Sequence, residues 1–286
     1  TVVDGAPCTS PGDRESDVLT NTLRTPPNGE AAGGSALAAV SVAMREAIDQ
    51  GRIDLAAALR WAARLQLNEG VCNHFSLEIG PDRYLINPQG LHWSEVRAGD
   101  ILLIDAGGKV LDGRHSLEPT AFFIHSWIHR MNRHAKCILH THMPYATALT
   151  LVDGGRLLMS GQNALRFHGK VAYDDRYNGL ALDDDEGRRI ASQLEGRSAM
   201  LMASHGVTVV GPNVAWAFDD LYYLERACMH QVLATQAAAG APLRIVDDAL
   251  AARVAEQVAG ERQQSEMFFA SICRMLDREE PGWSSL

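Results

Sequence analysis

The sequence predicts an α/β fold with a mixed, mainly antiparallel sheet. Short apolar runs rich in β-branched residues, which are typical of buried strands, alternate along the chain with longer segments of helical periodicity. Hairpin-like turns at Gly107-Gly108 and Gly206–Thr208 require antiparallel strand pairs. The chain has 286 residues, which is enough for one large domain or two small ones.

Charge and composition exclude several classes of partner. Lys and Arg number 26 against 35 Asp and Glu, a formal charge of −9, so we expect no nucleic-acid partner. No apolar run approaches the ~20 residues of a membrane helix, and the first residues do not resemble a signal peptide, so we expect no membrane partner. Five scattered cysteines without a CxxC pair predict reduced thiols and a cytoplasmic location.

The first part of the chain changes from irregular to helical sequence. Residues 1–34 are rich in Pro, Gly, Ser, Thr and Asp, and we expect an irregular N-terminal extension, either a flexible tail or an arm on a neighbouring subunit. Ser35–Gln50 is alanine-rich and predicts a helix. A second helix is predicted from an N-cap at Asp54 through Leu67, and Gly70 ends it.

Strands are predicted next, over Asn73–Ile79, Arg83–Asn87 and Ile101–Asp105. A proline-glycine turn, Pro88–Gly90, follows the second of these strands. Gly107-Gly108 then joins the third to another short strand.

A helix is predicted to open at Glu118-Pro119-Thr120 and to run to about Arg133. Proline suits the first helical position, and a carboxylate suits the positive end of the helix dipole. His125 and His129 lie four residues apart on one face of this helix. The spacing suits a metal pair, but the glutamate of an HExxH motif is absent, so we predict a histidine pair in the core or at the surface.

The second half of the chain continues the alternation. Phe167–Tyr173 is strand-like and carries His168, which either faces a site from its own or an adjacent subunit or is an ordinary strand histidine. Helices are predicted after the acidic cap at Asp183, over Val214–Ala239, and over Ile245–Leu276.

Histidines at the ends of two strands are the clearest chemical signal. Cys137–Leu139 reads as a buried strand, and alternation places His140 and His142 on one side of it, where two imidazoles can share a metal ion. The alternative is a pair of ordinary strand-end histidines. A third candidate, His205, follows the strand-like run Ala199–Ser204. Three neutral ligands would leave a metal its full charge to polarise a substrate oxygen.

Several further motifs accompany these histidines in a fixed order. In chain order they are "NHFSL", "INPQGL", "GDILLIDAGGKV", "CILHTHMPYATAL", "ALRFHGKVAYDD", "LMASHGVTVVG" and "AFDDLYYLERAC". Over roughly residues 55–240 the chain therefore resembles the class II aldolase/adducin superfamily. The resemblance implies that His140, His142 and His205 bind one divalent metal ion per subunit, with zinc expected first and manganese, iron or cobalt as alternatives.

The same resemblance implies an architecture. Residues 35–286, including the C-terminal helices, would form a single three-layer α/β/α domain around the mixed, mainly antiparallel sheet. Relatives assemble as tetramers, so we expect a homotetramer with the site at a subunit boundary.

The chain departs from the aldolases it resembles at two places. Those aldolases grip a substrate phosphate with the loops matching Asn73 and Pro88–Gly90, but the hydroxyl residue of that turn is Gln89 here. This favours a non-phosphorylated substrate, with phosphate held by backbone amides as the alternative. The catalytic Glu of those aldolases lies four residues before the position of His125, and this chain has Ala121 there.

These departures leave other residues as candidates for proton transfer and substrate binding. Glu118, one turn earlier, is either a catalytic carboxylate or a helix cap, and His168 is the second catalytic candidate. The residues expected to bind substrate are Asn73, His74, Gln89, Gly90, His125 and Tyr145.

The prediction that combines these observations is a metal-dependent carbon–carbon lyase acting on a small molecule. Without the aldolase Glu and the phosphate turn, decarboxylation of a hydroxylated aromatic or oxo carboxylic acid through a metal-stabilised enolate fits better than aldol cleavage. A class II aldolase acting on a hydroxy-carbonyl substrate is the alternative. A non-catalytic adducin-like interaction module is the alternative from another class, and iron-dependent oxygen chemistry fits three histidines without a carboxylate ligand poorly.

Overall fold

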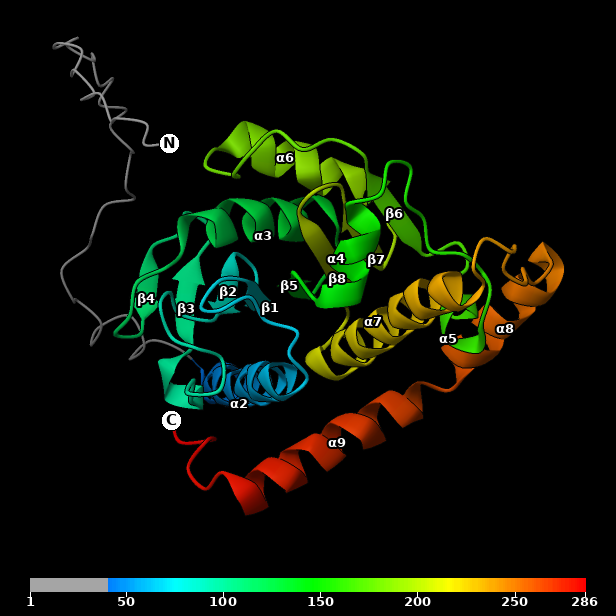
Figure 1. The fold of residues 1–286 in the computed structure, drawn as a ribbon. Coiled ribbons are helices and arrows are strands. Elements are labelled where there is room, and N and C mark those ends of the chain that lie inside the picture. The colour runs from blue at the N-terminus through cyan, green and yellow to red at the C-terminus, as the bar shows by residue number, and fades with distance from the viewer. Residues whose placement is uncertain (1–40) are drawn as a thin grey trace, which may run out of the picture.

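The computed structural model describes residues 41–286, so the predicted extension over residues 1–34 and the first six residues of the helix predicted over Ser35–Gln50 lie outside the described residues. One sheet of eight strands forms the centre, in the order β4-β3-β2-β1-β5-β8-β7-β6 (Figure 1). Every neighbouring pair is antiparallel except β6 and β7, which are parallel. The predicted mixed, mainly antiparallel sheet is therefore confirmed. The strands are β1 (His74–Gly80), β2 (Arg83–Ile86), β3 (Leu102–Asp105), β4 (Val110–Asp112), β5 (Cys137–Thr141), β6 (Val171–Asp174), β7 (Ala199–Met202) and β8 (Gly206–Gly211).

Alternation along the strands divides their side chains between two apolar layers. Leu139 and Val209 belong to a large cluster on one face, and their neighbours Ile138 and Val210 belong to a second cluster on the other. Because both faces of the sheet are apolar, both need a covering layer of helices.

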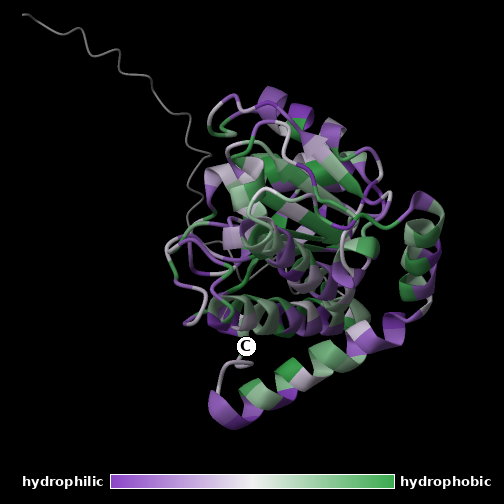
Figure 2. Cartoon of the chain, turned by 45° about the vertical axis from the view of Figure 1, so that its right-hand side comes forward, coloured by the Kyte–Doolittle hydropathy of each residue, from purple (hydrophilic) through white to green (hydrophobic). Residues whose placement is uncertain are grey.

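The larger cluster lies between the sheet and four helices: α2 (Val42–Arg64), α4 (Pro144–Thr150), α7 (Val214–Ala237) and α9 (Arg262–Glu279). The opposite face is covered by α3 (Pro119–Met131) and α6 (Asp184–Gln193), which pack against each other (Figure 1). The strands between these layers are mostly hydrophobic, while the outer helices carry many hydrophilic residues (Figure 2). The predicted three-layer α/β/α arrangement is therefore confirmed for the described residues.

The two helices predicted before β1 are one continuous helix, α2. Gly51 does not interrupt it, because that position lies against the sheet: a Cβ there would come within 2.7 Å of Leu85 Cδ1 and 2.9 Å of Leu77 Cδ2. Asp54 is inside the helix, where its side chain accepts a hydrogen bond from Gln50 instead of capping. Packing of α2 on the sheet therefore overrides the local signals for a break.

The C-terminal helical stretch is divided in two. Instead of one helix over Ile245–Leu276, α8 (Asp248–Gly260) ends at Glu261 and α9 follows. A short helix, α5 (Gln162–Leu165), contacts both α7 and α8. Helix α9 returns along α7 to α2, near the start of the described chain (Figure 1).

Both predicted hairpins are present, with one shift. Gly107-Gly108 joins β3 to β4 as expected. Gly206 belongs to β8, so the turn of the second hairpin is residues 203–205 and contains His205. The four cysteines of the described chain are free thiols. No helix among the described residues is long and apolar enough to cross a bilayer.

Candidate metal centre

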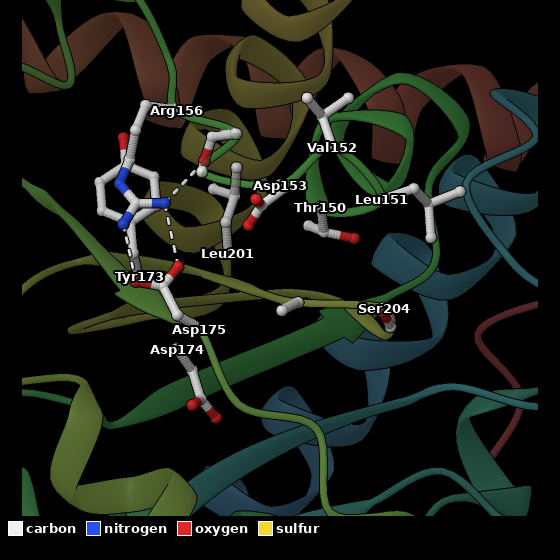
Figure 3. A pocket seen from close by; sticks show the side chains of 13 residues that line it. Thr150, Leu151, Val152, Asp153, Arg156, Tyr173, Asp174, Asp175, Leu201 and Ser204 are labelled. Carbon is white, nitrogen blue, oxygen red and sulfur yellow. Dashed lines mark hydrogen bonds and ion pairs between the residues drawn. The ribbon is translucent and has the colours of Figure 1, made fainter.

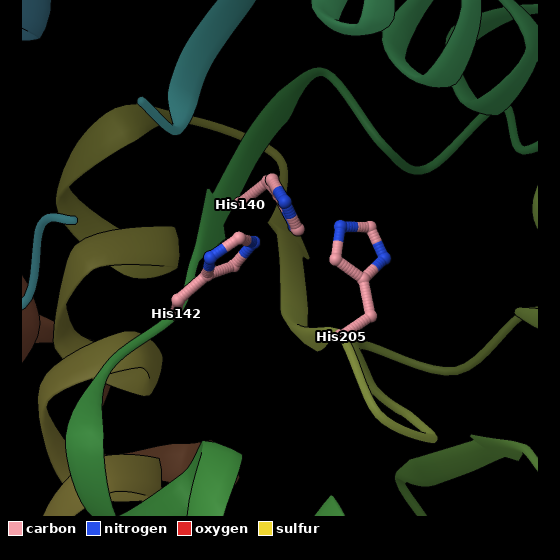
Figure 4. Close-up of side chains that lie close together, drawn as sticks. All are labelled: His140, His142 and His205. Carbon is pink, nitrogen blue, oxygen red and sulfur yellow. The ribbon is translucent and has the colours of Figure 1, made fainter. Parts of the chain in front are cut away.

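Three histidines lie close together, two at the end of a strand and one in the turn of a neighbouring hairpin. His140 is on β5, His142 is the first residue after β5, and His205 is in the β7–β8 turn. Their rings face one another (Figure 4), and one nitrogen from each lies within 4.8 Å of the others. Because β5 and β8 pair in register with His140 opposite Thr208, the turn before β8 places His205 beside the end of β5.

The orientation of His140 leaves one nitrogen for a ligand. Its Nδ1 is 2.9 Å from the carbonyl oxygen of Val207, so Nδ1–H donates there and Nε2 keeps its lone pair. The ring is buried, and a hydrogen bond of this kind fixes both tautomer and ring angle.

His142 is held through its backbone. Its N–H donates to the Asn73 side-chain oxygen at 3.3 Å, and Asn73 adopts a positive φ of 73° at the start of β1. Helix α4 begins two residues later, and the carboxylate of Glu225 on α7 accepts the N–H groups of Tyr145 and Ala146 at 2.8 Å each. The Nε2 of His142 is buried without a hydrogen-bond partner among the described residues, as expected for a nitrogen whose lone pair binds a metal ion.

The turn that carries His205 requires a glycine after it for reasons of space. A Cβ on Gly206 would lie 2.6 Å from the carbonyl oxygen of Thr141 and 2.7 Å from His142 Cδ2. The preceding residue, Ser204, has a φ of 56°. The close approach of the two chain segments therefore depends on Gly206.

The three rings are neutral at pH 7. Burial, followed by the nearby His142, lowers the pKa of His205 to about 4. Burial also lowers the pKa of His142, and burial with the surrounding histidines lowers that of His140 well below its usual range. Neutral imidazoles are ligands for zinc, iron, cobalt and related divalent ions, so the donor set, the orphaned His142 Nε2 and the fixed His140 tautomer all fit a metal ion.

His74 and Glu118 lie beside this cluster. The His74 ring stacks on the His140 ring, with centroids 4.8 Å apart and planes at 29°. Glu118 is the N-cap of α3: its Oε2 accepts the Ala121 N–H at 2.6 Å and the Thr120 hydroxyl at 2.5 Å. The same oxygen is 3.9 Å from His74 Nε2. Ala121 is fully buried.

The expected substrate contact His125 is enclosed. Its ring nitrogens lie 2.7 Å from His74 Nδ1 and 2.6 Å from Ser76 Oγ, and Ser76 Oγ is 2.8 Å from His129 Nε2. His125 therefore reaches a substrate only through His74. Ser76 is a member of this contact network that the sequence analysis did not single out, although strand alternation places it on the same face of β1 as His74.

The other expected site residues are placed apart from the three histidines or are already engaged. Asn73 braces the backbone of His142. Gln89 and Gly90 form an exposed turn in which the Gln89 N–H donates to Ser116. The Tyr145 side chain packs against the larger core cluster. His168 precedes β6 and lies 2.7 Å from Asp248 on α8.

A polar cavity of about 440 Å³ adjoins the β7–β8 turn at Ser204, the residue before His205. Asp153, Asp174 and Asp175 line it, and the Arg156 guanidinium pairs with Asp175 at 2.7 Å (Figure 3). The three histidines do not line this cavity, so it neighbours the cluster without containing it.

Comparisons with known proteins give the same family for sequence and structure. The family described as Class II Aldolase and Adducin N-terminal domain matches residues 53–232. A Pseudomonas aeruginosa protein bearing the name of a class 2 aldolase is 30% identical, covering 82% of this chain and 92% of its own. Decarboxylase NovR of Streptomyces niveus is 32% identical over 66% of this chain and 71% of its own. The crystal structure of an aldolase II superfamily protein from Pseudomonas syringae superposes with a TM-score of 0.78 at 30% identity, covering 88% of this chain and 100% of that one.

Proposed function

Because the chain belongs to the class II aldolase and adducin family, we propose that it is a metal-dependent carbon–carbon lyase whose ligands are His140, His142 and His205. The observation that carries the proposal is the convergence of three neutral imidazoles, with the Nε2 of His142 buried and unpartnered in the described chain. A divalent ion held there, zinc before manganese, iron or cobalt, would polarise a substrate oxygen and stabilise negative charge on it.

The reaction we propose is decarboxylation of a hydroxylated aromatic or oxo carboxylic acid. The bond between the carboxylate and its neighbouring carbon breaks, carbon dioxide leaves, and the electron pair stays on the substrate until a proton arrives. The relationship to decarboxylase NovR supports this choice. So does Ala121, whose methyl group offers no base for the hydroxyl proton that aldol cleavage must remove.

Glu118 is the residue we propose to deliver the proton that replaces carbon dioxide on the substrate. Its Oε2 is engaged in capping α3, so Oε1 is the carboxylate oxygen left to face a substrate. His74 is an expected substrate-binding residue beside the cluster, where its ring stacks on that of His140. The exposed turn at Gln89 and Gly90 would contact the bound substrate. His168 lies away from the histidine cluster of its own subunit, where it is hydrogen-bonded to Asp248. We therefore propose that it acts at the site of a neighbouring subunit.

We place this activity in a single domain over residues 35–286 of a cytoplasmic homotetramer whose subunits meet at the site. The tetramer is tested by light scattering of the purified protein.

Aldol cleavage is the second candidate, favoured by the likeness to the Pseudomonas aeruginosa protein that bears the name of a class 2 aldolase. A panel of hydroxylated and oxo acids separates the two reactions, because decarboxylation releases carbon dioxide and aldol cleavage releases an aldehyde or ketone. If the protein retains no metal and turns over no acid in the panel, the non-catalytic adducin-like role replaces both.

A further inference from the structure

Four buried side chains form a continuous hydrogen-bonded row behind the histidine cluster. His74 and Ser76 point from β1 toward α3, and His125 and His129 point from α3 toward the sheet. Side chains two apart on a strand and four apart on a helix are separated by about 6–7 Å, so the two pairs match. All four residues are at most 4% exposed.

The contact at the His129 end of the row determines which atom donates in each hydrogen bond along it. The Nδ1 of His129 is 2.7 Å from the carbonyl oxygen of Ala135, which can only accept a hydrogen bond, so His129 carries its proton on Nδ1. Burial and the nearby Lys136 ammonium lower the pKa of His129 to about 3, so the ring is neutral and its Nε2 has a lone pair.

Each following contact then has one possible direction. Ser76 must donate its hydroxyl hydrogen to His129 Nε2, 2.8 Å away, so its oxygen accepts from His125 Nδ1–H at 2.6 Å. Burial lowers the pKa of His125 well below its usual range and keeps the ring neutral, so its Nε2 accepts from His74 Nδ1–H at 2.7 Å. The neutral His74 ring is left with a lone pair on Nε2, the nitrogen nearest Glu118.

Two hydrogen-bond acceptors therefore face each other beside the three histidines. Glu118 Oε2, 3.9 Å from His74 Nε2, accepts hydrogen bonds from the Ala121 N–H and the Thr120 hydroxyl, so this carboxylate oxygen is an acceptor. A substrate group that approaches this pair is stabilised if it can donate a hydrogen bond, as a hydroxyl does, and is repelled if it can only accept, as a carbonyl oxygen does.

We propose that Ser76, His125 and His129 are positioning residues that hold His74 as a hydrogen-bond acceptor, so that this side of the site selects a substrate hydroxyl over a carbonyl. The selection rests on the proposed function only in assuming that the substrate binds at His140, His142 and His205. The proton positions in the row do not depend on it.

Neutron diffraction from crystals of the zinc-loaded protein grown in heavy water tests the row directly. We expect deuterium on Nδ1 of His74, His125 and His129, and a Ser76 hydroxyl directed at His129. Deuterium on His74 Nε2 would overturn the proposal, whatever the protein's metal content or lyase activity.

Ser76→Ala removes the middle of the row, and Ser126→Ala is the matched control. Ser126 is also a buried serine of this layer, next to His125, but its hydroxyl bonds, among residues 41–286, only to the Phe123 carbonyl. We expect Ser76→Ala to move deuterium to His74 Nε2 or divide it between the two nitrogens, Ser126→Ala to leave it in place, and Ser76→Thr to restore it. A single Nδ1 tautomer of His74 in Ser76→Ala would show that the row does not set it.

Selection is tested with two probes that present the same pair of adjacent oxygens, mandelate with a hydroxyl and benzoylformate with a carbonyl. Binding is followed by the visible spectrum of cobalt-substituted protein. We expect mandelate to bind about tenfold more tightly to wild type and Ser126→Ala, and the ratio to fall toward one in Ser76→Ala. Equal or tighter binding of benzoylformate to wild type would overturn the selection of a hydroxyl.

Discussion

The two faces of strands β1 and β5 differ sharply, although their residues alternate along the same chain. Toward α2 and α7, Phe75 and Leu139 are fully buried in the large apolar cluster. Toward α3, the next residues along, His74 and His140, are also buried but polar: the His74 ring is hydrogen-bonded to the His125 ring and stacks on the His140 ring. On these two strands the first face contributes apolar burial to the free energy of folding. The second face has apolar Ile138 but also holds neutral polar groups in defined orientations.

The largest expected effect separates chemistry from stability. His205→Ala removes one of three proposed ligands from a partly exposed turn, so metal retention and activity should fall to background while the fold persists. Metal analysis, turnover and circular dichroism on the same preparation check this. Full activity in the variant would remove His205 from the site.

The apolar face should respond in the opposite way. Phe75→Ala deletes a fully buried ring that lies 4.5 Å from Trp93, and we expect a loss of about 3–5 kcal/mol in the free energy of unfolding. Leu233→Ala, at an exposed position on α7, is the control and should stay within about 0.5 kcal/mol of wild type. Denaturant unfolding measures both, and equal losses would contradict the assignment of Phe75 to the core.

Lowering the pH should destabilise the folded protein through the buried histidines of the polar face. A buried histidine that stays neutral binds fewer protons in the folded than in the unfolded state, so stability is complete above pH 6.5 and falls as pH drops toward the folded pKa, about 3 for His129. His129 alone contributes a slope of up to about 1.4 kcal/mol per pH unit in this window. Unfolding of metal-free protein at a series of pH values measures the slope.

His129→Gln should flatten that slope, and His230→Gln, at an exposed position of α7, should not. The same slope in wild type and His129→Gln would mean that His129 is charged in the folded protein.

The smallest expected effect distinguishes the two roles of Glu118. Removing an N-cap costs about 1 kcal/mol, so Glu118→Ala and Asp183→Ala, which removes the cap of α6, should lose similar stability. Only Glu118→Ala should also lose turnover. If both variants keep wild-type turnover, Glu118 is a cap alone.

Local patterns were sufficient to predict much of this fold. Caps at Glu118, Asp183 and Asn213 mark helix starts because a side-chain oxygen meets free N–H groups within three residues. The strands and hairpins follow from alternation and glycine turns in the same way. The continuous α2 could not be predicted, because the approach of Gly51 to Leu85 and Leu77 is a tertiary contact.

The candidate site also has one part that local sequence predicts and another that depends on tertiary contacts. His140 and His142 share a side by strand alternation alone, and His205 is a candidate because it follows the strand-like run Ala199–Ser204. The family resemblance implies that all three bind one metal ion. The row from His74 to His129 depends on how α3 sits over β1, which no local pattern specifies. Asn73 has a contact that no local pattern specifies: its side-chain oxygen accepts the His142 N–H across the β1–β5 pair, while its expected role in substrate binding stays a prediction.

X-ray absorption spectroscopy of the purified protein tests the central claim most directly. The account predicts one divalent ion per chain with three imidazole nitrogens at about 2.0–2.1 Å, and the loss of that shell in His140→Ala. A metal bound through sulfur or carboxylates alone, or an unchanged shell in His140→Ala, would contradict it.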